Sequence, residues 1–462
     1  MNRTFIVTFS ILTLIILAYL MNKSTSNDSN NIITTNSLEN IETFDYEQYI
    51  SSEIMITDFN YLVEKIIEVH PDPKRNFEGN WSQVIEEMKI DFANPMPIGE
   101  YALKLMSFTS KLNDAHTEVY PQNLLSKQLP VGFQWVKEGL VISKSYVDAL
   151  NVGDLVLKIG DYTINDIFQK LSEYISSENE YWMKHKGLGF LRQEIFLEHF
   201  SFINDDSVKI TVERDHTIFD IDLKLVTNED IQLLNSIEQH TWYSWDFREN
   251  LNIGYFNIEE SNISAEFEKE VAHFFYEVSK ANIDNVIIDL RSNSGGNSGV
   301  VNSFLKHMPL SPILPYTGVI KFSQEASLQL GYQQSNGNEV FIASAPLIKS
   351  TPVYKGNIYI LTSPATFSSG SMFAVLFYDN KLATIIGEPT GGSPSSFGDT
   401  IMLELPYTKF TLLISHKEFI RPDDTQSMEN TLYPNISDEK TQADILGKDP
   451  QLERILKMIR ES

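Results

Sequence analysis

The chain has 462 residues, of which 42% are hydrophobic and 21% are charged, so it can bury a large core and is not a disordered polypeptide. Its formal net charge is −26, and we exclude nucleic acid as a partner because binding phosphates requires a basic surface. The chain contains no cysteine, which excludes disulfides, thiolate metal sites, iron–sulfur clusters and a cysteine nucleophile.

The first apolar segment predicts a targeting or anchoring role. Residues 5–21 carry no charge, Arg3 precedes them and Lys23 follows. Residues 1–22 therefore resemble either an uncleaved membrane anchor at the short limit of a spanning helix or a cleaved signal peptide, and a buried core helix is the third interpretation. The first two place the protein outside the cytoplasm, attached to the membrane through this segment or secreted. Residues 23–45, rich in Asn, Ser and Thr, are expected to form a flexible tether.

Residues 46–125 show helical spacing of apolar side chains and predict a helical N-terminal domain. One stripe runs through Phe59, Leu62, Val63, Ile66 and Ile67. Residues 126–228 change to short strands around one helix at 167–175, which is typical of a PDZ-like module that binds an extended peptide as an added strand. A β-domain without binding function is the alternative for this segment.

Residues 229–462 predict an α/β domain with a parallel sheet. Continuous apolar runs at 254–258, 286–290 and 358–362 alternate with helical patterns at 264–279, 298–307 and up to about 379. Buried strands separated by helices are typical of βαβ units.

Two of these strands end in segments that can carry chemistry. Residues 358–371 form a strand, a turn at Pro364 and the start of a helix, where a serine feels the helix dipole and unpaired N–H groups can bind an oxyanion. Ser368 and Ser369 can alternatively be ordinary helix caps. Residues 286–299 lead from a strand into a glycine-rich loop that lacks the Gly-Lys-Ser/Thr of a phosphate-binding loop.

Three motifs in this order, DLRSNSGG at 289–296, TSPATFS at 362–368 and GEPTGG at 387–392, resemble the carboxyl-terminal processing (tail-specific) serine protease family. The resemblance covers residues 251 to about 458 and implies a crotonase/Clp-like α/β core behind the helical and PDZ-like parts. It implies that Ser368 is the nucleophile. It further implies that the backbone N–H groups of Ser369 and of Gly295 or Gly296 form the oxyanion hole.

The general base is expected to be a histidine. The bacterial processing branch of the family has a lysine where this chain has Ser393, and the flanking lysines are Lys381 and Lys409. The sequence LNDAHT at 112–117 is similar to the Asp-Gly-His-Thr motif of the branch of tricorn protease and interphotoreceptor retinoid-binding protein, which implies His116 as the base. His416, after a predicted strand at 410–415, is the rival.

A carboxylate is expected to orient the histidine. The resemblance implies a glutamate some tens of residues after the nucleophile, and Glu429 is the first choice, with Glu418 and Asp424 as rivals. Asp289 and Arg291 are expected to be structural, although Arg291 can also bind a substrate carboxylate.

The sequence thus predicts an extracytoplasmic serine endopeptidase that cleaves polypeptides through an acyl-enzyme on Ser368. The alternative is a catalytically inactive protein on the same scaffold that binds apolar ligands or peptides. Neither a cofactor nor a metal is expected, and the oligomeric state is left open. A histidine base predicts that kcat/KM rises with an apparent pKa between roughly 6 and 7.5.

Overall fold

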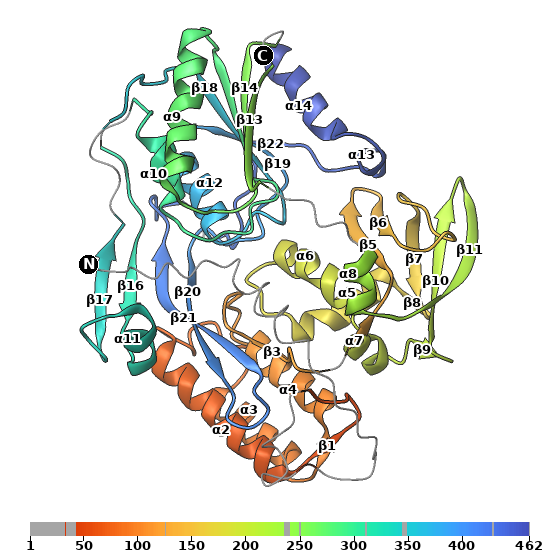
Figure 1. The fold of residues 1–462 in the computed structure, drawn as a ribbon. Coiled ribbons are helices and arrows are strands. Elements are labelled where there is room, and N and C mark those ends of the chain that lie inside the picture. The colour runs from red at the N-terminus through yellow and green to blue at the C-terminus, as the bar shows by residue number, and fades with distance from the viewer. Residues whose placement is uncertain are drawn as a thin grey trace.

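The computed structural model describes residue 33 and residues 43–124, 126–234, 241–248, 251–309, 312–343, 349–426 and 429–461. The apolar segment 5–21 and most of the predicted tether lie outside these ranges. Within them, no helix combines the length and the hydropathy needed to cross a bilayer. Figure 1 shows a helical part, a β-rich part and an α/β part that meet at the centre of the molecule.

The predicted helical N-terminal part is confirmed. Its helices are α2 (Ser52–Val69), α3 (Trp81–Asp91) and α4 (Ile98–Ser110), and the short strands β1 (Tyr49–Ile50) and β2 (Met96–Pro97) pair antiparallel. Ser51 caps α2, and Phe59, Leu62 and Ile66 of the expected stripe are fully buried, whereas Ile67 is 48% exposed. After α4 the chain forms a loop at 113–117 and then the strand β3 (Glu118–Tyr120).

The β-rich part is an antiparallel sheet with the strand order β11-β10-β7-β6-β5. These strands are β5 (Val131–Val136), β6 (Gly139–Ser145), β7 (Leu155–Ile159), β10 (Ser207–Arg214) and β11 (Thr217–Lys224), extended by β8 (Tyr162–Thr163) and β9 (Ile203–Asn204). Strands β4 (Lys127–Gln128) and β12 (Val226–Thr227) pair separately, and α8 (Asn228–Leu234) follows them. The predicted helix corresponds to α5 (Ile164–Leu171) and η2 (Ser172–Tyr174), whereas α6 (Glu180–Phe190) and α7 (Glu194–His199) were not predicted.

The predicted parallel sheet is also confirmed. Its order is β13-β14-β15-β18-β19-β22, and all of these strands except the edge strand β13 run parallel. The strands are β13 (Tyr243–Arg248), β14 (Ile253–Ile258), β15 (Asn285–Asp289), β18 (Asn357–Thr362), β19 (Thr384–Gly387) and β22 (Ile436–Ser437).

Helices cover both faces of this sheet. On one face α9 (Ala265–Lys280), α10 (Val300–Leu305) and α12 (Ser369–Asp379) pack against alternate residues such as Val286 and Ile288. On the other face α14 (Pro450–Glu461), which follows α13 (Gln442–Leu446), packs against Ile287 and Leu361. The central strands β14, β15 and β18 are mostly apolar, as expected for strands with both faces covered.

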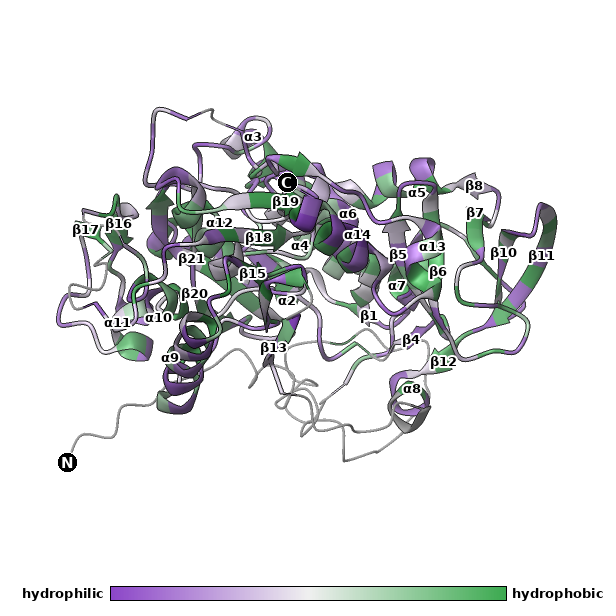
Figure 2. Ribbon diagram, turned by 90° about the horizontal axis from the view of Figure 1, so that it is seen from above, coloured by the Kyte–Doolittle hydropathy of each residue, from purple (hydrophilic) through white to green (hydrophobic). Residues whose placement is uncertain are grey.

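A second sheet, which was not predicted, carries the loop at 113–117 to the α/β part. Its order is β17-β16-β21-β20, and β3 pairs with β21. The strands are β16 (Thr317–Lys321), β17 (Asn338–Ile342), β20 (Ser396–Glu404) and β21 (Thr411–Ile420), and α11 (Gln324–Leu330) connects β16 to β17. The strand predicted at 410–415 is thus longer, so His416 lies within it and not after it. Figure 2 shows the parallel sheet between β16 and β17 at one end and the β-rich part at the other.

Candidate active site

The corner between β18 and α12 holds Ser368 in a strained backbone conformation. Its φ is 50° and its ψ is −124°, which non-glycine residues rarely adopt. Ser368 precedes α12, and in the described part of the chain its side chain makes no capping hydrogen bond to that helix. The interpretation of Ser368 as an ordinary N-cap is therefore wrong. Instead its Oγ lies 3.1 Å from His116 Nε2. This strand–turn–helix corner therefore presents a serine hydroxyl to a histidine, as in nucleophile elbows.

The glycine loop after β15 packs directly against this serine. Gly295 and Gly296 have φ values of 108° and 131°, which favour glycine. Asn293 Oδ1 accepts hydrogen bonds from the Gly295 N–H (3.0 Å) and from Ser261 Oγ (3.0 Å). In the part of the chain that the structure describes, the N–H groups of Gly296 and Ser369 have no acceptor. Of the three predicted oxyanion donors, these two are therefore free to bind an oxyanion.

We expect Gly295→Ala to lower kcat/KM by roughly 10²-fold, because misplacing a reacting group by about 1 Å can cost that much. An added Cβ would lie 2.6 Å from Ser368 Cβ and 3.2 Å from its Oγ. Gly331→Ala is the matched control, because Gly331 also has a positive φ (75°). Apart from its immediate chain neighbours, no described atom lies within 4 Å of the Cβ that this substitution adds. Kinetic assays that show equal losses in the two variants would contradict the close-approach argument.

Asp114 holds the loop that carries His116. Its Oδ1 accepts the His116 backbone N–H at 3.0 Å, and its Oδ2 accepts the hydroxyls of Thr117 (2.5 Å) and Ser415 (2.7 Å) and lies 3.2 Å from His70 Nε2. Although burial raises the pKa of Asp114, its hydrogen bond to His70 and the charges of His70 and His116 bring it well below its ordinary value. Asp114 is therefore an ionised anchor for the loop.

The His116 ring is fixed by stacking and is kept neutral by burial. Its centroid lies 4.7 Å from that of Phe367, which in turn stacks on Trp182 of α6 at 3.6 Å. Only 12% of the side chain is exposed. Burial lowers the pKa of His116, and although Asp114 raises it, the net shift is downward. A neutral imidazole beside a serine hydroxyl can accept its proton.

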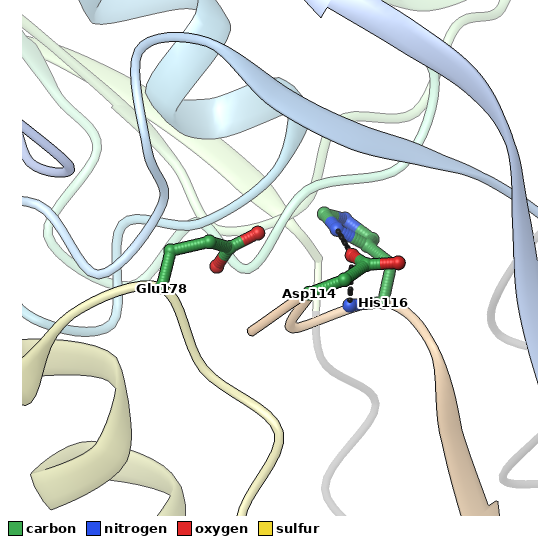
Figure 3. Close-up of side chains that lie close together, drawn as sticks. All are labelled: Asp114, His116 and Glu178. Atoms are coloured by element: carbon green, nitrogen blue, oxygen red, sulfur yellow. Dashed lines mark hydrogen bonds and ion pairs between the residues drawn. The ribbon is translucent and has the colours of Figure 1, made fainter. Parts of the chain in front are cut away.

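A carboxylate that was not predicted, Glu178, lies near this ring. Figure 3 shows its side chain directed towards Asp114 and His116 from the segment that leads into α6. Donor atoms of the three residues lie within 4.8 Å of one another. Such atoms can also bind a metal, but both Asp114 oxygens already accept hydrogen bonds, so we interpret the group as an acid–base cluster. Burial, and then the charge of Asp114, raises the pKa of Glu178 to about 8.

The rival base His416, and Ser393 at the position of the family's lysine, are engaged elsewhere. His416 is bound through both ring nitrogens, with Nδ1 at the Asp399 carbonyl and Nε2 3.0 Å from the Tyr332 hydroxyl. The Ser393 hydroxyl, at the position of the family's lysine, donates to the Ser395 carbonyl at 2.7 Å. Of the candidate bases, only His116 contacts Ser368.

The predicted orienting carboxylate makes no contact with the imidazole within the described residues. Glu429 is exposed, and none of the contacts within the described ranges joins it to His116. Its neighbour Asn430 donates from Nδ2 to the Glu178 carbonyl (3.1 Å), so Glu429 lies on the segment next to Glu178. Of its rivals, Glu418 pairs with Arg75 and Asp424 is exposed. The catalytic role of Glu429 stays a prediction.

Asp289 and Arg291 have the structural role that the sequence indicated. Arg291 Nη2 lies 2.6 Å from Asp289 Oδ2 and 2.5 Å from Asp449 Oδ2, so it ties the end of β15 to the residue before α14. Its guanidinium is therefore occupied and not offered to a substrate carboxylate.

Sequence reasoning missed two residues of the site. His70 is the C-cap residue of α2 and also contacts Asp114. Its Nδ1 accepts the Asp72 N–H at 3.1 Å, so its Nε2 carries the proton that points to Asp114. Glu178 had no distinguishing signal, because it is one of 62 acidic residues.

Known proteins resemble both the sequence and the fold. Residues 252–437 match the model of peptidase family S41. A carboxyl-terminal-processing protease of Synechocystis sp. is 30% identical over 149 residues, a match that spans 32% of this chain and 30% of that relative. Two solved structures, mature CPAF and mature CPAF complexed with lactacystin, superpose with TM-scores of 0.65 and 0.66. They share 16% identity and cover 88% of this chain and 97% and 98% of theirs, so they show the fold alone. Residues 252–437 are thus similar to peptidase family S41, and the geometry of the corner that holds Ser368 agrees with this similarity.

Proposed function

We propose that the protein is a serine endopeptidase that cleaves polypeptides outside the cytoplasm through an acyl-enzyme on Ser368. The observation that carries the proposal is the 3.1 Å contact between Ser368 Oγ and His116 Nε2 at a strained corner beside the glycine loop. The match of residues 252–437 to peptidase family S41 and the similarity to a carboxyl-terminal-processing protease support it.

The mechanism follows from the positions of these groups. Ser368 Oγ attacks the scissile carbonyl while His116 Nε2 takes its proton, and the N–H groups of Ser369 and Gly296 bind the resulting oxyanion. The imidazolium then gives the proton to the leaving amine, and the peptide bond breaks. Water, deprotonated by the same histidine, hydrolyses the acyl-enzyme and restores Ser368.

A histidine base fits this site better than a lysine base. Lys186 of α6 is a buried lysine whose charge reaches His116, but its ammonium pairs with Glu118 of β3. Burial lowers the pKa of Lys186 to about 7, so its charge alone does not rule it out. Its position does, because its ammonium lies at Glu118 whereas His116 Nε2 lies 3.1 Å from Ser368 Oγ. This argument supports the branch of the family that resembles tricorn protease.

Other features support the proposed substrate and location. An extended polypeptide can add to an edge strand of the antiparallel sheet, whose outer strands are β5 and β11, as peptides add to PDZ domains. The uncharged run at residues 5–21 supports a location outside the cytoplasm, with the protein anchored or secreted.

Labelling with a fluorophosphonate tests the proposal. Ser368 Oγ should attack phosphorus and displace fluoride, and the labelled peptide, identified by mass spectrometry, should contain residue 368. Ser371→Ala should keep the label, because the Ser371 hydroxyl only donates to the Thr366 carbonyl one turn back. Absence of labelling together with tight binding of an apolar ligand or peptide would instead support the non-catalytic alternative.

A further inference from the structure

We infer that Glu178 is the carboxylate that orients His116, and that the two side chains hold one exchangeable proton between them. The inference rests on the proposed function for its catalytic meaning. It differs from the sequence-based prediction, because the orienting residue would come from the segment before α6 and not from the segment after the nucleophile.

Unsatisfied polar atoms on both residues carry the inference. Within the described residues, His116 Nδ1 and both Glu178 carboxylate oxygens are buried and have no hydrogen-bond partner of ordinary geometry, although the Ala115 N–H faces the carboxylate. Buried polar groups without a partner are rare, because each costs about 1–3 kcal/mol. A donor nitrogen and an acceptor carboxylate that are left over in one cluster are therefore complementary.

Asp114 is the only other carboxylate of the cluster, and it is already committed. Its Oδ1 lies 3.9 Å from His116 Nδ1 and accepts the backbone N–H of the same residue. Its Oδ2 is surrounded by the Thr117 and Ser415 hydroxyls and His70. Asp114 thus fixes the loop, and Glu178 is free to fix the ring. A small rotation of the Glu178 side chain on substrate binding would complete the contact, since such sites often tighten only in the complex.

The shared proton has a consequence that does not depend on which residue carries it. Serine attack needs His116 neutral with its proton on Nδ1, facing an ionised Glu178. When this active form binds one more proton, either His116 or Glu178 can hold it. The pair therefore loses that proton at a higher pH than an isolated histidine would. Burial and the charge of Asp114 raise the pKa of Glu178 to about 8. This value agrees with an acid limb of the kcat/KM profile whose apparent pKa lies above the range of roughly 6 to 7.5 expected for a histidine without this partner.

The other charged groups that face the pair are fixed by their own partners. Asp399 of β20 raises the pKa of His116, and Lys186 lowers it. Asp399 pairs with Lys417 of β21, and its carbonyl binds His416, whereas Lys186 pairs with Glu118. Asp114 and its neighbour His70 complete the set. His185 of α6 is kept neutral at physiological pH because burial lowers its pKa to about 4. None of these groups is altered by a substitution at position 178.

The first test is the pH dependence of kcat/KM in Glu178→Gln. We expect the acid limb to move down by at least one pH unit and the plateau of kcat to fall about 10-fold or more, because the amide cannot take the charge of the carboxylate. Glu180→Gln, an exposed residue whose carboxylate pairs with Lys184 at 2.8 Å, is the control and should change neither quantity. A Glu429→Gln variant that moves the limb while Glu178→Gln leaves it in place would overturn the inference.

The second test measures the imidazole itself and needs no activity. In a Ser368→Ala background, the ¹⁵N shifts of the His116 ring, assigned by their loss in His116→Asn, report its protonation and tautomer. We expect Glu178→Gln to shift the titration to lower pH and to reduce the Nδ1–H tautomer. Unchanged shifts would refute the pairing even if the protein proves to be a peptidase, and a clear shift in a protein without hydrolytic activity would refute only the proposed function. Thermal unfolding of each variant checks that it is folded.

Discussion

Ser368→Ala should lower kcat/KM for peptide hydrolysis by at least about 10⁴-fold, because it removes the nucleophile from a site whose groups act as a unit. The remaining rate would come from the oxyanion donors and from substrate binding. Alanine can adopt the strained backbone of position 368 no less readily than serine and is smaller, so the melting temperature should change little.

The assay is hydrolysis of an unfolded protein, followed by mass spectrometry of the products. The Ser368→Ala protein should still bind this polypeptide, with an affinity close to that of the unmodified chain. Activity that persists in Ser368→Ala at the level of the parent would exclude the assignment of the nucleophile and, with it, the acyl-enzyme.

His116→Ala should lower kcat/KM by about 10²-fold or more, the usual contribution of a general base. The acid limb of the pH profile should disappear as well, because the serine would lose the group whose deprotonation controls attack. His116 must be neutral to accept the proton, so activity is lost as the pH falls through the apparent pKa of the His116 site and is retained above it.

His416→Ala is the matched control for this variant. Both histidines are largely buried in or beside β21, but His416 binds the Asp399 carbonyl and the Tyr332 hydroxyl and not Ser368. Its removal should reduce stability and leave the pH limb in place. If the acid limb of the pH profile disappeared in His416→Ala and persisted in His116→Ala, the base would be His416 and not His116.

Local patterns were sufficient for the helical part and for the central strands of the parallel sheet, whereas β13, β19 and β22 were not predicted. Apolar runs such as 286–290 and 358–362 are largely buried, and their short length and their alternation with helical patterns distinguish them from helices. The second sheet escaped prediction, although a strand at 410–415 within β21 was predicted, because β21 pairs with β3 and β16, both remote in sequence. No short window contains the partner that makes such a strand stable.

The sequence by itself indicated the candidate nucleophile corner, the glycine loop and a histidine base in place of the family's lysine, because each of these predictions depends on a motif of a few adjacent residues. The tertiary structure decided how these pieces meet. The pairing of β3 with β21 carries His116 to a serine 252 positions away, and α6 brings Trp182 over Phe367. Only the tertiary structure selected Glu178 from 62 acidic residues, since a carboxylate acquires a raised pKa and an orienting role only by losing its water in the folded core.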